Sequence, residues 1–186
     1  FADVGVRVVQ LTYNSANHLG SSCWEPRDAG LTRVGHRMVE ALNGAGVLVD
    51  ISHVGDVTGL DAVHASALPI AVTHGNPRSF CDSPRNKPDE VIDAVAGRGG
   101  VIGCTLYPLF MGGADLTLNE YCSMLAALAD RVGAEHVAIG SDAVVGWQSD
   151  ALGWMRSGRW DRPEPSQIPM FPPWPAWFSG PQDFAN

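Results

Sequence analysis

Two histidines that follow successive apolar segments are the residues of this chain best placed to do chemistry. His53 follows the apolar run 47–51, and His74 follows a second run, 68–72. Both runs lack polar alternation, which is typical of strands buried on both faces of a parallel sheet. The segment 56–66 between them fits a crossover helix and predicts a βαβ unit. Because the carboxyl ends of parallel strands meet at one edge, we expect the two imidazoles to be neighbours.

Two neutral imidazoles held at rigid strand ends suit a divalent metal, zinc above all. A histidine after a strand can instead be a loop residue that only makes hydrogen bonds, and the spacing alone leaves both interpretations open. The remaining histidines have no such setting, and we expect them on the surface or on helix faces: His18, His36, His64 and His136.

The composition indicates an acidic, ordered chain. Its 186 residues are 45% hydrophobic, enough for one domain with a real core. Twelve lysines and arginines oppose 20 aspartates and glutamates, and the net charge of -8 argues against nucleic acid as a partner. We expect no transmembrane helix and no signal peptide. The four cysteines are scattered, which predicts free thiols and a cytoplasmic location, and a homo-oligomer is left open.

Alternating strand and helix patterns continue on both sides of the histidine pair. Further strands are predicted at 6–11, 101–105 and 137–139, the first of them buried, and further helices at 31–43, 88–96 and 118–132. A closed (β/α)8 barrel takes about 250 residues. We therefore predict an α/β fold, an incomplete TIM barrel of about five βα units. An open sheet is the alternative, but the chain starts inside a patterned segment and ends without a final helix, which favours part of a barrel.

Polar residues in other loops extend the candidate site. Tyr13 and Asn14 follow the first predicted strand, and Asp142 follows the last one. Asn17 lies in the first loop as well, where making a turn is at least as good an explanation. Arg85 lies in the irregular loop after the second histidine strand. Its two-pronged guanidinium could clamp a carboxylate, or it could be a solvated surface charge.

The last forty residues differ in character. Residues 147–186 hold five of the six tryptophans and seven prolines. Tryptophan at this density argues against a disordered linker, because such side chains need burial or a partner. Within one barrel domain, we predict that residues 1–146 form the βα units and that 147–186 form an insertion or lid across the open face.

Five stretches of the sequence, in order over residues 5–142, carry a family resemblance. They are GVRVVQLTYNSAN, GLTRVGHRMVEALNGAGVLVDISHVG, AVTHGNPRSFCDSPRN, PDEVIDAVAGRGGVIG and VAIGSD. With them the chain resembles the middle and later part of a membrane (renal) dipeptidase family protein in its bacterial form, among the amidohydrolase-type metal-dependent barrels.

The resemblance implies a dipeptidase in which two zinc ions share a hydroxide that attacks the peptide carbonyl. His53 and His74 match family histidines that each bind one of two zinc ions. Arg85 matches an arginine that contacts the terminal carboxylate of a small dipeptide substrate, and Asp142 matches an aspartate that handles the proton. Tyr13 stands where some members have a histidine that binds the scissile carbonyl oxygen.

The sequence departs from the family pattern in two places. The family's His-x-Asp metal pair and its bridging glutamate have no counterpart here, and we expect them upstream of Phe1. Asp142 is followed by residues 143–145, AVV, where the family has a phenylalanine and a second aspartate. This change and Tyr13 motivate an alternative, a non-catalytic barrel homologue that acts as a scaffold or binding protein.

Overall fold

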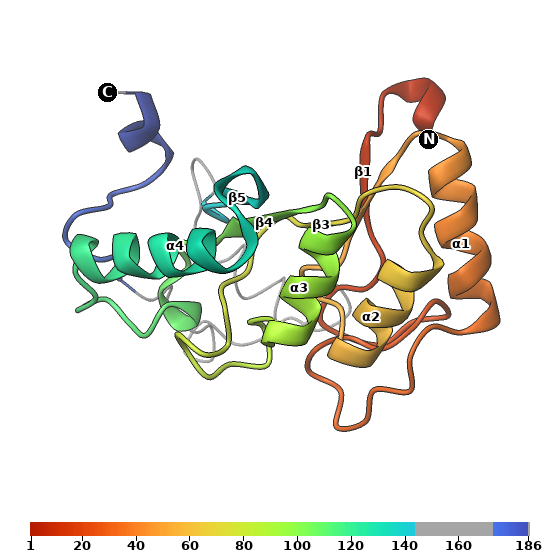
Figure 1. The fold of residues 1–186 in the computed structure, drawn as a ribbon, viewed down its shortest axis with the longest axis horizontal. Helices are drawn as coiled ribbons and strands as arrows, with labels where there is room; N and C mark the ends of the chain where they lie inside the picture. Colours follow the sequence, from red (N-terminus) through yellow and green to blue (C-terminus); the bar gives the residue numbers. More distant parts are fainter. Residues whose placement is uncertain (144–172, 186) are drawn as a thin grey trace, which may run out of the picture.

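A parallel sheet of five strands organises the computed structural model, which describes residues 1–143 and 173–185 (Figure 1). The strands are β1 (Val8–Gln10), β2 (Leu48–Asp50), β3 (Ala71–Val72), β4 (Val101–Cys104) and β5 (Val137–Ile139). The α-helices are α1 (Arg33–Gly44), α2 (Asp56–Ala65), α3 (Asp89–Gly97) and α4 (Leu118–Val132). Short 3-10 helices are η1 (Ala2–Val4), η2 (Pro108–Phe110), η3 (Ala134–His136) and η5 (Pro181–Ala185).

The strands are arranged in the order of the sequence, and every neighbouring pair is parallel. Each crossover from β1 to β5 carries an α-helix, as a parallel connection requires. Consecutive helices pack on one another, α1 on α2, α2 on α3 and α3 on α4. This is the predicted series of βα units, and it places the carboxyl ends of all five strands along one edge.

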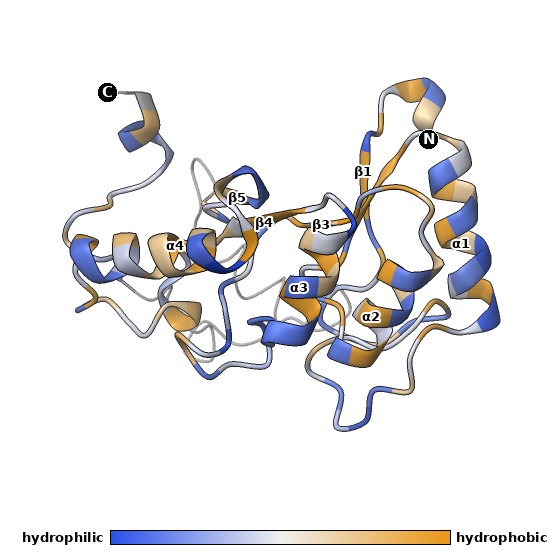
Figure 2. Cartoon of the chain, in the orientation of Figure 1, coloured by the Kyte–Doolittle hydropathy of each residue, from blue (hydrophilic) through white to orange (hydrophobic). Residues whose placement is uncertain are grey.

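The core lies between the sheet and these helices. Figure 2 shows the apolar residues concentrated along the strands and in stripes on the helices. Fully buried members include Val49, Ile51, Val72 and Ile102 from the sheet region and Val39, Val63, Ile92 and Leu128 from the helices. Removal of this surface from water is the main source of the fold's stability.

Two predicted strands differ from the observed ones. The first is not buried, because β1 is an edge strand and Val8 is 48% exposed. The predicted strand 68–72 is shorter, since pairing begins only at Ala71. Pro69 has no amide proton to contribute to the ladder, and Leu68 before it is 44% exposed. The remaining elements agree with the prediction to within one or two residues.

The loop between β1 and α1 is fastened to the start of α2 by one carboxylate. Gly55, the N-cap of α2, has no side chain to cap the helix. Asp28 replaces that cap from outside the helix, because its Oδ2 accepts from the Thr58 amide at 3.0 Å and its Oδ1 from the Thr58 hydroxyl at 2.5 Å. Asp28 also accepts from the Gly30 amide. The loop that carries Tyr13 and Trp24 is therefore anchored beside the end of β2.

The end of the chain packs on α4. Trp177 donates from Nε1 to the Leu116 carbonyl at 2.7 Å, and its ring lies 5.6 Å from that of Tyr121. Phe178 is 4% exposed. Most of the predicted lid lies outside the described residues, so its place over the barrel stays a prediction. All four cysteines are free thiols, and none of the described helices is long and apolar enough to cross a membrane.

Glycine at 103 is required by the close approach of β3 and β4. A Cβ there would lie 2.2 Å from the Thr73 carbonyl oxygen. We expect Gly103→Ala to lower the free energy of unfolding by about 1–3 kcal/mol, because backbone must move in a packed sheet. Gly97→Ala is the matched control, since no atom lies within 4 Å of its Cβ position. Chemical denaturation of both variants checks this, and equal stability would contradict it.

Candidate metal centre

The structure brings His53 and His74 together at the ends of β2 and β3. Asp50 of β2 pairs with Ala71 of β3. His53 lies three residues after Asp50, and His74 lies three residues after Ala71. The two Nε2 atoms are 3.0 Å apart, and the ring centroids are 5.1 Å apart. The juxtaposition expected from the sequence is therefore present, and it follows directly from the register of two neighbouring parallel strands.

Asn14 orients the His53 ring. The Nδ1 atom of His53 lies 2.9 Å from the side-chain oxygen of Asn14, with the amide assigned so that its oxygen faces the ring. An amide oxygen only accepts, so Nδ1 carries the proton. The lone pair of His53 is then on Nε2, facing His74. Tyr13 stacks on the same imidazole with ring centroids 4.3 Å apart.

A buried carboxylate orients the His74 ring through one hydroxyl group. Asp50 is 4% exposed, and its oxygens accept from the hydroxyls of Ser52 at 2.5 Å and Thr73 at 2.8 Å. Both hydroxyl protons are thus used, so the Thr73 oxygen can only accept from His74 Nδ1, which lies 2.8 Å away. His74 therefore also carries its proton on Nδ1, and its Nε2 lone pair faces His53.

These two imidazoles fit a divalent metal. Burial lowers the pKa of His53 to about 2, with Arg85 and His74 adding to the effect, and burial also lowers the pKa of His74. Both rings are therefore neutral near pH 7, and two lone pairs converge without a proton between them. A cation between the two Nε2 atoms would accept both lone pairs, and imidazole nitrogen is a preferred zinc ligand.

The pair is only part of such a site. A zinc site normally uses three or four protein ligands. Within residues 1–143 and 173–185, no cluster of three or more histidine, cysteine or acidic side chains could hold a metal. The expectation that further ligands lie upstream of Phe1 stays a prediction.

Arg85 is a buried residue that supports both histidine loops. It is 1% exposed, so its interpretation as a solvated surface charge is wrong. Nη1 donates to the Ser52 carbonyl, and Nη2 donates to the His74 carbonyl at 2.9 Å. Its Nε is buried without a partner among the described residues. Burial lowers the pKa of Arg85, and its role as a clamp for a substrate carboxylate stays a prediction.

Lys87 was not identified from the sequence as part of the site. It is 1% exposed and donates from Nζ to the Val54 carbonyl at 2.5 Å. Burial and the neighbouring Arg85 lower the pKa of Lys87 to about 8. Pro77 and Lys87 form an isolated parallel bridge, a long-range pairing that no local pattern reveals. Asp50 was also missed, although an acidic residue ending an apolar run is a usable signal.

Asp142 follows β5 and interacts electrostatically with His74. Its carboxylate and the His74 ring are close enough that the carboxylate opposes the lowering of the His74 pKa. Burial of the carboxyl group raises the pKa of Asp142, while His74 and Arg85 oppose this. The backbone of Asp142 is left-handed, with φ at 58°.

The other sequence candidates divide into two groups. Asn17 makes a turn, because its side chain donates to the Leu11 carbonyl and accepts from the Leu19 amide. His18, His36 and His64 are exposed as expected. His136 is partly buried, and its Nδ1 lies 2.7 Å from the Gly100 carbonyl oxygen, which gives it a structural partner.

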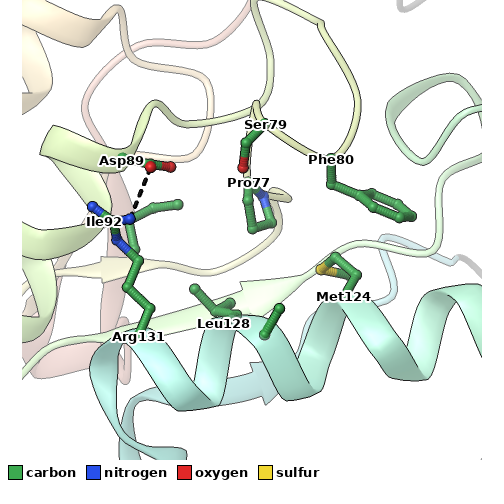
Figure 3. Close-up of a pocket in the computed structure, with 9 residues that line it drawn as sticks. Pro77, Ser79, Phe80, Asp89, Ile92, Met124, Leu128 and Arg131 are labelled. Atoms are coloured by element: carbon green, nitrogen blue, oxygen red, sulfur yellow. Dashed lines mark ion pairs between the residues drawn. The ribbon is translucent and has the colours of Figure 1, made fainter.

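A cavity of about 340 Å³ lies between α3, α4 and the loop after β3, apart from the histidine pair (Figure 3). Ile92, Met124 and Leu128 line it, and an ion pair of 2.8 Å joins Arg131 and Asp89 at its side. None of the site residues predicted from the sequence lines this cavity. The candidate chemistry therefore belongs to the strand ends.

Comparison with known proteins points to one family. The model of the membrane dipeptidases (peptidase family M19) matches residues 1–155. Dipeptidase verJ of Clonostachys rogersoniana is 34% identical over 141 residues, which are 75% of this chain and 36% of that protein. The chain thus spans about a third of that relative's length.

Two solved structures share the fold. An amidohydrolase from Pseudomonas aeruginosa is 34% identical with a TM-score of 0.77, and the match covers 82% of this chain and 47% of that one. A metallopeptidase from Rhodobacter sphaeroides, liganded with a phosphinate mimic of the dipeptide L-Ala-D-Ala, is 25% identical with a TM-score of 0.69. That match covers 75% of this chain and 43% of the metallopeptidase.

The hydrogen-bonded path from Asp50 through Thr73 to His74 predicts a loss of metal affinity when the hydroxyl is removed. In the complete protein, Thr73→Val should weaken zinc binding by about 10–100-fold, because the ring loses the partner that fixes its tautomer. Thr73→Ser keeps the hydroxyl and is the control. Competition with a chromogenic chelator measures both affinities. Equal affinity in the valine variant and the parent would rule out this orienting role.

Proposed function

The chain belongs to the membrane dipeptidase family (peptidase family M19), and on that premise we propose that the complete protein is a zinc-dependent dipeptidase. One observation carries the proposal: His53 and His74 are both neutral and both present Nε2 to the same point. A pair that served only to hydrogen-bond would place a proton between the two nitrogens. The partners of both Nδ1 atoms indicate instead that neither Nε2 carries one.

His53 and His74 would share one divalent ion, rather than bind one of two ions each as the resemblance implies, because both Nε2 atoms face the same point. When bound, zinc polarises the scissile carbonyl group and lowers the pKa of a water molecule. The chain's own residues then have separate tasks. Asn14 and Thr73 hold the two imidazoles in the tautomer that leaves Nε2 free, and Arg85 fixes the carbonyl ends of both histidine loops.

Asp142 is the proposed proton carrier. A carboxylate that stands beside His74 at a strand end can accept a proton from the attacking water and return it to the leaving amine. Burial raises the pKa of Asp142, which brings a carboxyl group nearer to the pH at which it can both accept and donate. Tyr13, which is 43% exposed beside His53, is proposed to contact the substrate, and Arg85 is proposed to bind the substrate's carboxylate.

The proposed substrate is a short peptide with a free carboxylate. The similarity of this chain to the metallopeptidase whose structure holds a dipeptide mimic supports this substrate class. The four free thiols favour a reducing compartment, so a cytoplasmic location is proposed with it. The rival function is a non-catalytic barrel that serves as a scaffold, favoured by the sequence after Asp142.

Removal of either histidine tests the proposed function. His53→Ala and His74→Ala in the complete protein should each abolish dipeptide hydrolysis and lower the zinc content, while circular dichroism stays unchanged. His64→Ala is the control, since this side chain is exposed in the last turn of α2. Zinc is measured by mass spectrometry on purified protein. A parent protein without zinc and without hydrolysis would support the scaffold instead.

Replacement of Asp142 separates proton transfer from a structural role. Asp142→Asn keeps the shape and tolerates the left-handed backbone at φ 58°, so folding and zinc content should not change. If the carboxylate carries the proton, kcat falls by about 10²–10⁴-fold while KM changes little. Asp130→Asn on the exposed face of α4 is the control. A normal kcat with full zinc content would remove Asp142 from the reaction.

A further inference from the structure

Exposed aromatic rings flank the histidine pair. Among the described residues, four aromatic side chains are strongly exposed: Phe1, Tyr13, Trp24 and Phe184. Phe1 and Phe184 lie at the two ends of the chain. Tyr13, 43% exposed, stacks directly on His53. Scattered exposed aromatics need no explanation, but two rings beside one polar centre form a feature that a ligand can use.

Trp24 is held beside His53 by backbone bonds. The Cys23 amide donates to the His53 carbonyl at 2.9 Å. Ser22 pairs with Val54 as an antiparallel bridge, and its hydroxyl accepts from the Trp24 amide at 3.1 Å. The backbone of Trp24 is therefore fixed to the loop that carries His53, although its side chain is 46% exposed.

Phe110, the last residue of η2, supplies a third ring. Its centroid lies 6.5 Å from that of Trp24, with the planes at 45°, and 5.1 Å from the guanidinium carbon of Arg85. Asn76 and Asn86 both donate to the Phe110 carbonyl, at 3.0 Å and 2.9 Å. The backbone of Phe110 is thus fixed to the loop that follows His74 and carries Arg85.

We infer that Tyr13, Trp24 and Phe110, the aromatic rim, select dipeptides with a large apolar or aromatic side chain. This inference rests on the proposed dipeptidase function and names the substrate class of that site. An apolar side chain lying on Trp24 and Phe110 removes exposed ring surface from water, and an aromatic one can stack at an angle on both rings. Glycine offers no such surface.

Trp24 is the residue to test, because it is neither a predicted metal ligand nor a residue that orients one, and its side chain is 46% exposed. In the complete protein, kcat/KM for Gly-Phe or Phe-Gly should exceed that for Gly-Gly by about 10-fold or more. Trp24→Ala should lower kcat/KM for the preferred phenylalanine dipeptide by about 10-fold, mainly by raising KM. The same variant should change kcat/KM for Gly-Gly by less than about 2-fold. Trp24→Phe keeps a ring and should retain most of the preference.

Phe184→Ala is the matched control, because Phe184 is an exposed ring on η5. This variant should leave kcat/KM for all three dipeptides unchanged. Zinc content and circular dichroism of Trp24→Ala must equal the parent values. If the variant hydrolyses all three dipeptides with the parent's preference, the aromatic rim does not select the substrate and the inference is wrong. If the parent protein hydrolyses none of them, the dipeptidase function itself fails, and the inference fails with it.

Discussion

The buried carboxylate of Asp50 is the group on which the arrangement of the site depends. It accepts hydrogen bonds from the amides of Ser52 and Thr73 and from the hydroxyls of the same two residues. The two bonds from Thr73 join the end of β2 to the end of β3, which share only a short ladder, while the two from Ser52 fix the turn after β2. A buried charge is costly unless its oxygens are fully bonded, so the carboxylate and the two strand ends fix each other. His53 and His74 follow directly from this junction.

Two buried cations complete the support from the other side. Arg85 bonds the carbonyls of Ser52 and His74, and Lys87 bonds the carbonyl of Val54. Each carbonyl lies on or next to a histidine, so the cations hold the backbone. Asp50 orients the His74 ring through Thr73, and Asn14 orients the His53 ring. Neither cation has an ion pair among the described residues, and burial lowers the pKa of both. A buried cation without an ion pair reduces stability.

The family match and the hydrogen bonds of the two imidazoles are independent observations, and both are compatible with a metal site. Membership in the M19 family rests on the match over residues 1–155, while the tautomers of the two imidazoles rest on hydrogen-bond partners alone. The chain spans 36% of one dipeptidase and 47% of one solved amidohydrolase. What this part contributes is a pair of neutral imidazoles that face each other and the aromatic rim next to His53.

The sequence by itself determined the order of the elements, because helix and strand periodicity and end signals are local. The predicted start of α4 at Leu118 coincides with a capping box of Thr117 and Glu120. The meeting of His53 with His74 followed from the rule that parallel strands end at one edge. Only the tertiary structure decided the burial of Arg85 and Lys87 and the task of Asp50. Their cross-loop partners lie 23 to 33 residues away: Thr73 for Asp50, Ser52 for Arg85 and Val54 for Lys87. Such contacts depend on how loops fold back over strand ends, and no local sequence pattern records that.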